Sequence, residues 1–154
     1  METESPLAAR VGANVRHFRA LRGVSVRELS ARLGELGRPI LPSGITKLEK
    51  GGRRVDVDEL IALAVALGVN PNALLLLPYG QEDSNVQLTK SITVSWHRAW
   101  GWAAGDVPLD GPARPSERVQ WFEISKPHRV DELKIDDLID QAHEAHRQDN
   151  LDES

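Results

Sequence analysis

The order of helices in this chain can be read outward from the stretch VRHFRALRGVSVRELSARLG, residues 15–34. Apolar side chains recur at helical spacing before its first glycine, which predicts an amphipathic helix over residues 7–22. After that glycine, Ser25 stands three residues before a glutamate in a capping-box pattern. A second, short helix is therefore predicted for residues 26–33, with Gly34 as its stop.

Three more helices are predicted after a turn rich in glycine and proline at residues 35–41. Each has its own start signal. Pro42 suits the first position of the third helix, Asp56 with Glu59 repeats the capping-box pattern before the fourth, and Asn70 with Pro71 opens the fifth. Glycine or proline ends each of them, and the predicted helices cover residues 42–50, 57–67 and 71–77.

The pattern changes from a helical period to a period of two after the fifth helix. Apolar and polar side chains alternate over residues 86–96, which predicts a half-buried strand or a tight hairpin. Trp96 and Trp100 are then one helical turn apart, and residues 105–116 are predicted to form a loop. Residues 118–124 are a second candidate strand, and residues 129–148 are predicted to form an acidic helix before a frayed tail.

Charge is distributed unevenly along the 154 residues. The formal net charge of −4 on its own argues against an acidic partner such as DNA. Residues 10–54, however, contain eleven Lys or Arg and three Glu, whereas residues 81–154 contain eight basic and fifteen acidic residues. The basic half has the profile of a polyanion-binding domain, and the acidic half masks it in the total.

These segments resemble a known family of regulators. Residues 15–34, together with SGITKLEKG at residues 43–51, resemble the first two helices and the recognition helix of the phage-repressor (Cro/C1, or XRE) family, in a bacterial, actinobacterial-like form. Residues 56–77 resemble the fourth and fifth helices, so the resemblance covers about residues 10–78. About five extra residues, 35–39, depart from the usual pattern in the turn before the recognition helix. The resemblance implies a DNA-binding transcription regulator whose recognition helix, about residues 42–50, enters the major groove.

The composition of the third helix agrees with this role on physical grounds. A recognition helix needs small or polar side chains toward the base edges, apolar side chains toward the core and basic flanks for phosphate. Ile45 and Leu48 fall on the predicted core side, Lys47 is able to donate to guanine, and the N–H groups that open the second helix suit a phosphate. The residues expected to contact DNA are Ser25, Val26, Arg38, Pro42, Ser43, Thr46, Lys47, Lys50, Arg53 and Arg54. The resemblance implies that Arg19 and Glu49 form a supporting ion pair instead.

Other chemistries lack a set of residues to carry them. The chain has no cysteine, which excludes disulfides and thiolate metal sites. His143, His146 and Asp140 lack a complete ligand set, so neither a metal nor another cofactor is expected. The four tryptophans are expected to form a small core or contact surface rather than a ligand cage. No catalytic constellation occurs with useful spacing, and an enzyme is not expected.

The sequence thus predicts a mainly α-helical protein in three parts. Residues 7–78 are expected to form a five-helix, repressor-like helix-turn-helix domain, residues 79–128 a small extension with strands and tryptophans, and residues 129–154 an acidic helix and tail. The expected function is a cytoplasmic, sequence-specific regulator without a membrane span. It is expected to bind double-stranded DNA as a homodimer, because a single domain contacts too few base pairs for genomic specificity. The alternative is a protein-interaction module, such as an antitoxin or adaptor, that holds a protein partner through its C-terminal extension and binds DNA secondarily.

Overall fold

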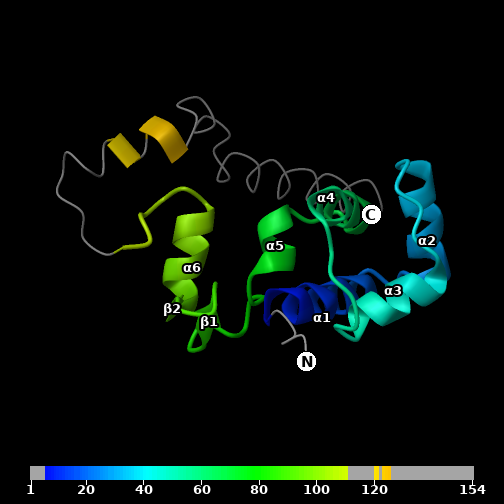
Figure 1. The fold of residues 1–154 in the computed structure, drawn as a ribbon, viewed down its shortest axis with the longest axis horizontal. Coiled ribbons are helices and arrows are strands. Elements are labelled where there is room, and N and C mark those ends of the chain that lie inside the picture. Colours follow the sequence, from blue (N-terminus) through cyan, green and yellow to red (C-terminus); the bar gives the residue numbers. More distant parts are fainter. Residues whose placement is uncertain (1–5, 111–119, 122, 126–154) are drawn as a thin grey trace, which may run out of the picture. The chain divides into compact units, whose positions relative to one another are not determined.

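The computed structural model describes residues 6–110, 120–121 and 123–125. The chain divides into two compact units, Met1–Gly111 and Pro112–Ser154. The elements of the first unit are α1 (Pro6–Leu21), α2 (Val26–Glu35), α3 (Pro42–Glu49), α4 (Val57–Leu67), α5 (Pro71–Leu75), β1 (Asn85–Gln87), β2 (Thr93–Ser95) and α6 (Trp96–Ala103) (Figure 1). The predicted fold class is confirmed: a mainly helical protein with a small strand and helix extension that contains tryptophan.

The start signals of the helices act through hydrogen bonds to their first backbone N–H groups. Ser25 Oγ accepts from the N–H of Glu28 at 3.1 Å, and the Glu28 carboxylate accepts from the N–H of Ser25 at 3.4 Å, which completes the predicted capping box. Only half of the second predicted box forms. The Asp56 carboxylate accepts from the N–H of Glu59 at 2.7 Å, but the Glu59 side chain holds Arg53 instead of reaching back.

Helix α2 is longer than predicted, because Gly34 lies inside it rather than at its end. A glycine inside a helix costs about 1 kcal/mol relative to alanine, but it does not by itself supply a stop. The stop comes from Gly37, whose φ of 73° lies in the left-handed region. The N–H of Gly37 donates to the Gly34 carbonyl, and the N–H of Arg38 donates to the Leu33 carbonyl at 2.9 Å. The extra residues therefore lengthen α2 and its C-terminal turn, and α3 still begins at Pro42.

One apolar core lies between the five N-terminal helices. Leu29 and Leu33 of α2, Ile45 and Leu48 of α3, and Leu63 of α4 are fully buried in it. Helix α1 contacts α3, α4 and α5, and α2 packs against α3 and α4 (Figure 1).

The alternating segment forms a hairpin rather than a single strand. Strands β1 and β2 are antiparallel, with Val86 opposite Val94. Ser95 then caps α6, so Trp96, predicted as the last residue of the strand, is the first residue of a helix. Val86 and Ala99 are buried with Leu76 in a second, smaller apolar cluster beside the main core.

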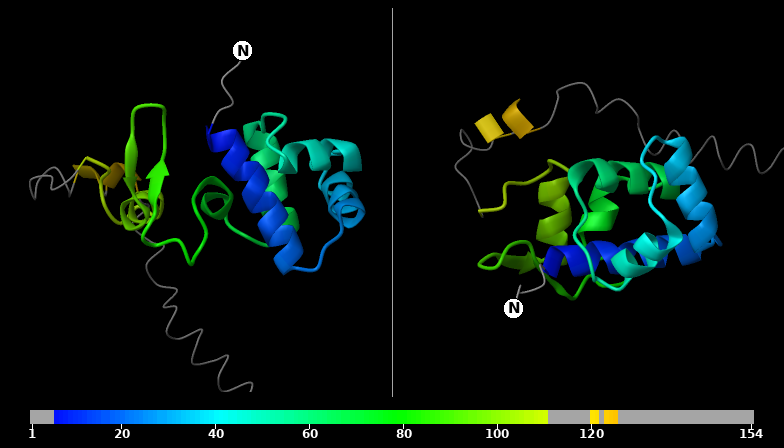
Figure 2. Two further views of the ribbon diagram at one scale, coloured as in Figure 1. Left: turned by 90° about the horizontal axis from the view of Figure 1, so that it is seen from below. Right: turned by 45° about the vertical axis from the view of Figure 1, so that its right-hand side comes forward.

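The carbonyl groups at the end of α5 join this extension to the helical domain. A helix ends with carbonyl groups that have no partner within the helix. The side-chain amide of Asn14 in α1 donates to the carbonyls of Ala73, Leu74 and Leu76 at 3.2, 3.0 and 2.6 Å. The indole N–H groups of Trp96 and Trp100 both donate to the Leu77 carbonyl at 2.9 Å. Both views in Figure 2 show the hairpin and α6 at the end of the unit opposite α2 and α3.

Two elements are predicted for the C-terminal half, a strand at residues 118–124 and an acidic helix at residues 129–148. The strand predicted for residues 118–124 is wrong, because the described residues among them, 120–121 and 123–124, are helical. So short a segment does not by itself distinguish a strand from a helical turn. The acidic helix predicted for residues 129–148 lies outside the described residues. Helix α5 also ends at Leu75, two residues before its predicted end.

Candidate nucleic-acid interface

Helix α3 presents a polar surface to the outside and an apolar surface to the core. Ile45 and Leu48 are fully buried, whereas Ser43, Thr46 and Lys47 are exposed. The cap position of α3 is a leucine, Leu41, which makes no side-chain hydrogen bond to the first turn. The N-terminal end of α3 therefore keeps backbone N–H groups and the positive end of the helix dipole available to an anion.

The contact between α1 and α3 is close because α1 has a glycine there. A Cβ atom on Gly12 would overlap the carbonyl oxygen of Leu48, which is backbone and has little freedom to move. Gly12 was not singled out from the sequence, although a glycine inside a predicted helix is itself a signal of close packing.

An ion pair fixes the C-terminal end of α3 to α1. The Arg19 guanidinium donates to both Glu49 carboxylate oxygens, at 2.6 and 3.1 Å, and to the Val24 carbonyl at 2.9 Å. Both side chains are largely buried, with exposed fractions of 18% and 8%. The hydrogen bond to Glu49 raises the pKa of Arg19 further above its ordinary value. Arg19 thus links α1, the turn before α2 and α3, which is the supporting arrangement that the family resemblance implies.

The N-terminal end of α2 is partly occupied by its own side chains. The N–H of Ser25 already has an acceptor in Glu28, and Val26 is half-buried against the core. The carboxylate of Glu28 also pairs with Arg32 at 3.1 Å. A phosphate at this end would have to compete with that carboxylate, and the predicted contacts of Ser25 and Val26 with DNA stay predictions.

Arg38 connects the lengthened turn to the start of α4. Its guanidinium lies 2.6 Å from the Asp56 carboxylate and 3.7 Å from that of Asp58. Two hydrogen bonds lower the pKa of Asp56: the larger effect comes from the N–H of Glu59 and the smaller from the Arg38 side chain. Asp56 in turn raises the pKa of Arg38. The predicted contact of Arg38 with DNA is untested, and its guanidinium has partners inside the protein.

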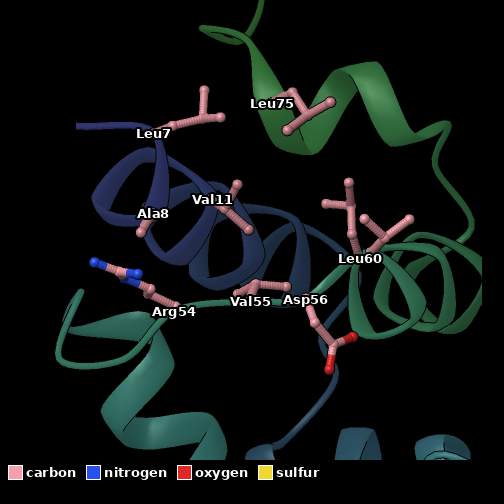
Figure 3. A pocket seen from close by; sticks show the side chains of 9 residues that line it. Leu7, Ala8, Val11, Arg54, Val55, Asp56, Leu60 and Leu75 are labelled. Atoms are coloured by element: carbon pink, nitrogen blue, oxygen red, sulfur yellow. The ribbon is translucent and has the colours of Figure 1, made fainter. Parts of the chain in front are cut away.

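The two arginines after α3 differ in their surroundings. Arg53 makes a two-pronged ion pair with Glu59 at 2.9 and 3.1 Å, and it also donates to the Arg54 carbonyl. Arg54 is exposed. Figure 3 shows it beside Ala8 at the rim of an apolar pocket of about 470 Å³, with the Asp56 carboxylate pointing away from the pocket. Val55 packs on the core and lines the same pocket as Val11 of α1 and Leu60 of α4. The residue that follows Arg54 is therefore anchored by apolar packing.

Several predicted DNA contacts therefore lie on one continuous stretch of chain. It runs from the leading edge of α3 through Lys50 to the loop before α4, and the aliphatic stem of Lys47 lies beside Gly52. Arg10, which belongs to the basic half of the sequence, is not part of this surface. Its guanidinium donates to the carbonyls of Leu75 and Gln87 at 3.1 and 2.7 Å, and burial lowers its pKa. Sequence reasoning also missed Asn14, because its acceptors are about sixty residues away in the chain.

Comparisons with known proteins match the N-terminal half of the chain. The sequence profile of the helix-turn-helix family matches residues 15–74, which include α2, α3, α4 and α5. The chain is 32% identical to the clp gene regulator ClgR of C. glutamicum, over 45% of this chain and 83% of that one, with a TM-score of 0.40. The chain belongs to the helix-turn-helix family.

Two other solved helix-turn-helix proteins match a similar share of the chain. The restriction-modification controller protein C.AhdI of Aeromonas hydrophila is 27% identical, over 44% of this chain and 94% of that one, with a TM-score of 0.39. The DNA-binding domain of BldD is 27% identical, over 47% of this chain and 99% of that one, with a TM-score of 0.40. No curated protein sequence matches the chain. As a member of the helix-turn-helix family of Cro/C1 (XRE) type, the protein is a DNA-binding regulator of transcription.

The described residues contain neither a membrane-spanning helix nor a cluster of metal ligands. In the part of the chain that the structure describes, no helix is long and apolar enough to cross a bilayer. Within the same residues, no group of three or more His, Asp or Glu side chains is arranged to hold a metal ion.

Proposed function

We propose that this helix-turn-helix protein is a sequence-specific transcription regulator that binds double-stranded DNA as a homodimer, with α3 in the major groove. The observation that carries the proposal is the two-sidedness of α3. Its buried side is fully occupied by Ile45 and Leu48, while Ser43, Thr46 and Lys47 are exposed on the outer side. The ion pair between Arg19 and Glu49 fixes the C-terminal end of the helix. Such a helix is pre-positioned, so little ordering is needed when it binds.

Roles within this surface follow from the position of each side chain. Pro42, Ser43, Thr46 and Lys47 are proposed to face base edges, because they lie on the leading edge and outer side of α3. Lys50 and Arg54 are exposed at the end of the helix and on the following loop, which suits contacts with phosphate. For Arg53 and Arg38 the carboxylate partners support a positioning role, in which each arginine holds the loop or turn that carries other DNA contacts.

The extension from residue 79 to residue 110 is proposed to stabilise the DNA-binding domain from the end away from α3. The indole N–H groups of Trp96 and Trp100 both donate to the Leu77 carbonyl of the same chain. This internal use supports a buttressing role for the two indoles. The alternative function, a protein-interaction module, would have to use other groups of the extension, such as the exposed side chains of Tyr79 and Trp102.

Selection of duplexes from a random pool by the full chain, followed by sequencing, tests the proposed function. We expect one enriched motif with two-fold symmetry, and fluorescence anisotropy should show binding of that motif that weakens steeply as salt rises. Equal binding of all duplexes at every salt concentration would contradict sequence-specific recognition. Enrichment of a motif without symmetry would contradict the homodimer alone.

A further inference from the structure

The N-terminal end of α3 carries a large, exposed apolar side chain. Leu41 occupies the cap position of this helix and is 74% exposed. Leucine is among the poorest residues at a cap position, because it offers no oxygen to the free N–H groups of the first turn. The caps of α2, α4, α5 and α6 are Ser25, Asp56, Asn70 and Ser95, and each accepts such a hydrogen bond. Leu41 therefore lowers the stability of its helix and gains little from burial, a conflict that is typical of functional positions.

Thr46, one turn further along α3, also presents an apolar group. Its hydroxyl donates to the Pro42 carbonyl, four residues earlier, at 3.0 Å. Threonine side chains inside helices bond back to the backbone in this way. Thr46 is exposed. Because its hydroxyl is directed to the backbone of its own helix, the methyl group is the part of the side chain left to face an approaching molecule.

Pro42 connects these two side chains into one surface. Residues four apart lie on the same side of a helix, so the ring of Pro42 and the side chain of Thr46 are neighbours. Side chains lean toward the N-terminal end of their helix, which directs Thr46 toward that ring. Together, Leu41, Pro42 and the methyl group of Thr46 form the N-terminal patch. It is small and apolar, and it adjoins the exposed polar side chains of Ser43 and Lys47.

The major groove of DNA offers one kind of apolar group on its base edges. All four bases present donors or acceptors of hydrogen bonds there, and thymine alone adds a C5 methyl group. The side chains of leucine and proline neither donate nor accept hydrogen bonds, and the hydroxyl proton of Thr46 is already donated to Pro42. Apolar contact with the methyl group is an established way for side chains to read thymine. The N-terminal patch is therefore complementary to thymine and to none of the other three bases.

We propose that Leu41 and Thr46, with Pro42 between them, are specificity-determining residues that select thymine through its C5 methyl group. The inference rests on the proposed function, because α3 must enter the major groove for the N-terminal patch to meet this methyl group. It adds to that function the kind of base that is read. The donors of Ser43 and Lys47 stay available for the polar edges of neighbouring bases.

Replacement of thymine by deoxyuridine removes this methyl group and leaves base pairing unchanged. The probe is the motif that the full chain enriches from the random pool, with each thymine replaced in turn. Anisotropy titrations should show at least one thymine position in each half-site at which the wild type binds uracil about three- to fivefold more weakly, as expected for the loss of one buried methyl contact. Thymines that flank the motif are the matched control, and their replacement should leave the affinity unchanged.

Conservative variants assign the effect to the two side chains. Thr46→Ser keeps the hydroxyl and removes the methyl group, whereas Thr46→Val keeps a methyl group and removes the hydroxyl. We expect the serine variant to lose the discrimination between thymine and uracil at one position, and the valine variant to retain it. Leu41→Ser should also lose discrimination, yet its midpoint of thermal unfolding should rise, because serine is the better cap. A protein that is more stable and less selective does not owe its loss of selectivity to unfolding.

The outcomes separate this inference from the proposed function. Val65→Ala removes exposed apolar surface from α4 and should discriminate between thymine and uracil as the wild type does. Equal affinity for thymine and uracil at every position of an enriched motif would overturn the inference and leave the proposed function intact. Discrimination that survives unchanged in both Thr46→Ser and Leu41→Ser would overturn it as well. A selection that enriches no motif would contradict the proposed function itself, and the inference with it.

Discussion

Arg53 and Glu59 hold the loop between α3 and α4 by two hydrogen bonds of 2.9 and 3.1 Å. The pair is largely shielded, with side-chain exposures of 25% and 16%. We expect Arg53→Ala to lower the free energy of unfolding by about 1–3 kcal/mol, between the values typical of exposed and of buried pairs. Urea denaturation measures this change. Arg27→Ala, on the exposed side of α2, is the control and should change stability by about 0.5 kcal/mol or less. Unchanged stability with lost DNA affinity would instead make Arg53 a phosphate contact.

Lys47 and Arg54 should contribute to DNA binding in different ways. Lys47→Ala should cost about 1–3 kcal/mol on the specific site and relax the preference at one base position, with little effect on random DNA. Arg54→Ala should weaken specific and random DNA by similar factors and reduce the salt slope by about one. Anisotropy titrations of both duplexes at several salt concentrations distinguish the two patterns. A change of base preference in the Arg54 variant would show that the placement of the recognition helix is wrong.

Gly12 should be the glycine on which the position of α3 depends. Gly12→Ala places a methyl group against the Leu48 carbonyl, and we expect a loss of stability of about 1–3 kcal/mol together with weaker specific binding. Gly34→Ala is the matched control, since it lies inside α2 with open space around it. That substitution should raise stability by about 0.5–1 kcal/mol. Thermal unfolding of the two variants should therefore shift in opposite directions, and equal shifts would argue against the close contact.

The shared acceptor of Trp96 and Trp100 predicts effects that do not add. Trp96→Phe or Trp100→Phe alone should cost about 1 kcal/mol, because the other indole still donates to the Leu77 carbonyl. The double variant should lose more than the sum of the single losses, because that carbonyl then loses both indole donors. Trp102→Phe serves as the control, since Trp102 is 40% exposed and its indole N–H makes no hydrogen bond to any residue that the structure describes. A strictly additive double variant would mean that the two donors act independently.

The carboxylate of Asp56 should make stability depend on pH in the acid range. Its pKa is lowered in the folded protein by the N–H of Glu59 and by Arg38, so the unfolded chain takes up a proton first as pH falls. The stabilisation is complete above the ordinary pKa of an aspartate and is lost as pH falls below about 4. In Asp56→Asn, which keeps an acceptor for the cap, the urea midpoint should fall less steeply over that range than in the wild type. Parallel curves for the two proteins would contradict this assignment.

The local signals in the sequence predicted the helices well, because each is encoded within a few residues. Pro42, Ser25 and Asn70 start their helices as expected, and the polar side of α3 follows directly from its period. The sequence predicts a stop at Gly34, but a glycine near the end of a short helix either ends the helix or lies within it. Only the left-handed φ of Gly37 shows which glycine ends α2.

Contacts between distant parts of the chain could not be predicted from local patterns. Arg38 meets Asp56 across eighteen positions, so its charge alone suggested a DNA contact. Arg10, which was counted only in the charge of the basic half, reaches Gln87 across seventy-seven positions. The strand predicted for residues 118–124 was wrong for a related reason, since a segment of seven residues lacks the context that selects a strand. The sequence could therefore indicate which surface is basic, whereas the fold was needed to separate cations held by carboxylates or carbonyls from those that face outward.

The two indoles bonded to the Leu77 carbonyl also give the protein a natural optical probe. All four tryptophans, at 96, 100, 102 and 121, follow the helices of the DNA-binding domain in sequence. Intrinsic emission excited at the indole band therefore reports on the extension rather than on α3. Release of α6 from α5 would expose Trp96 and Trp100 to water and shift that emission to longer wavelength, whereas occupation of α3 by DNA at the far end of the unit should leave it unchanged. A single unlabelled sample can thus show whether ligand binding and loosening of the extension are linked or separate events.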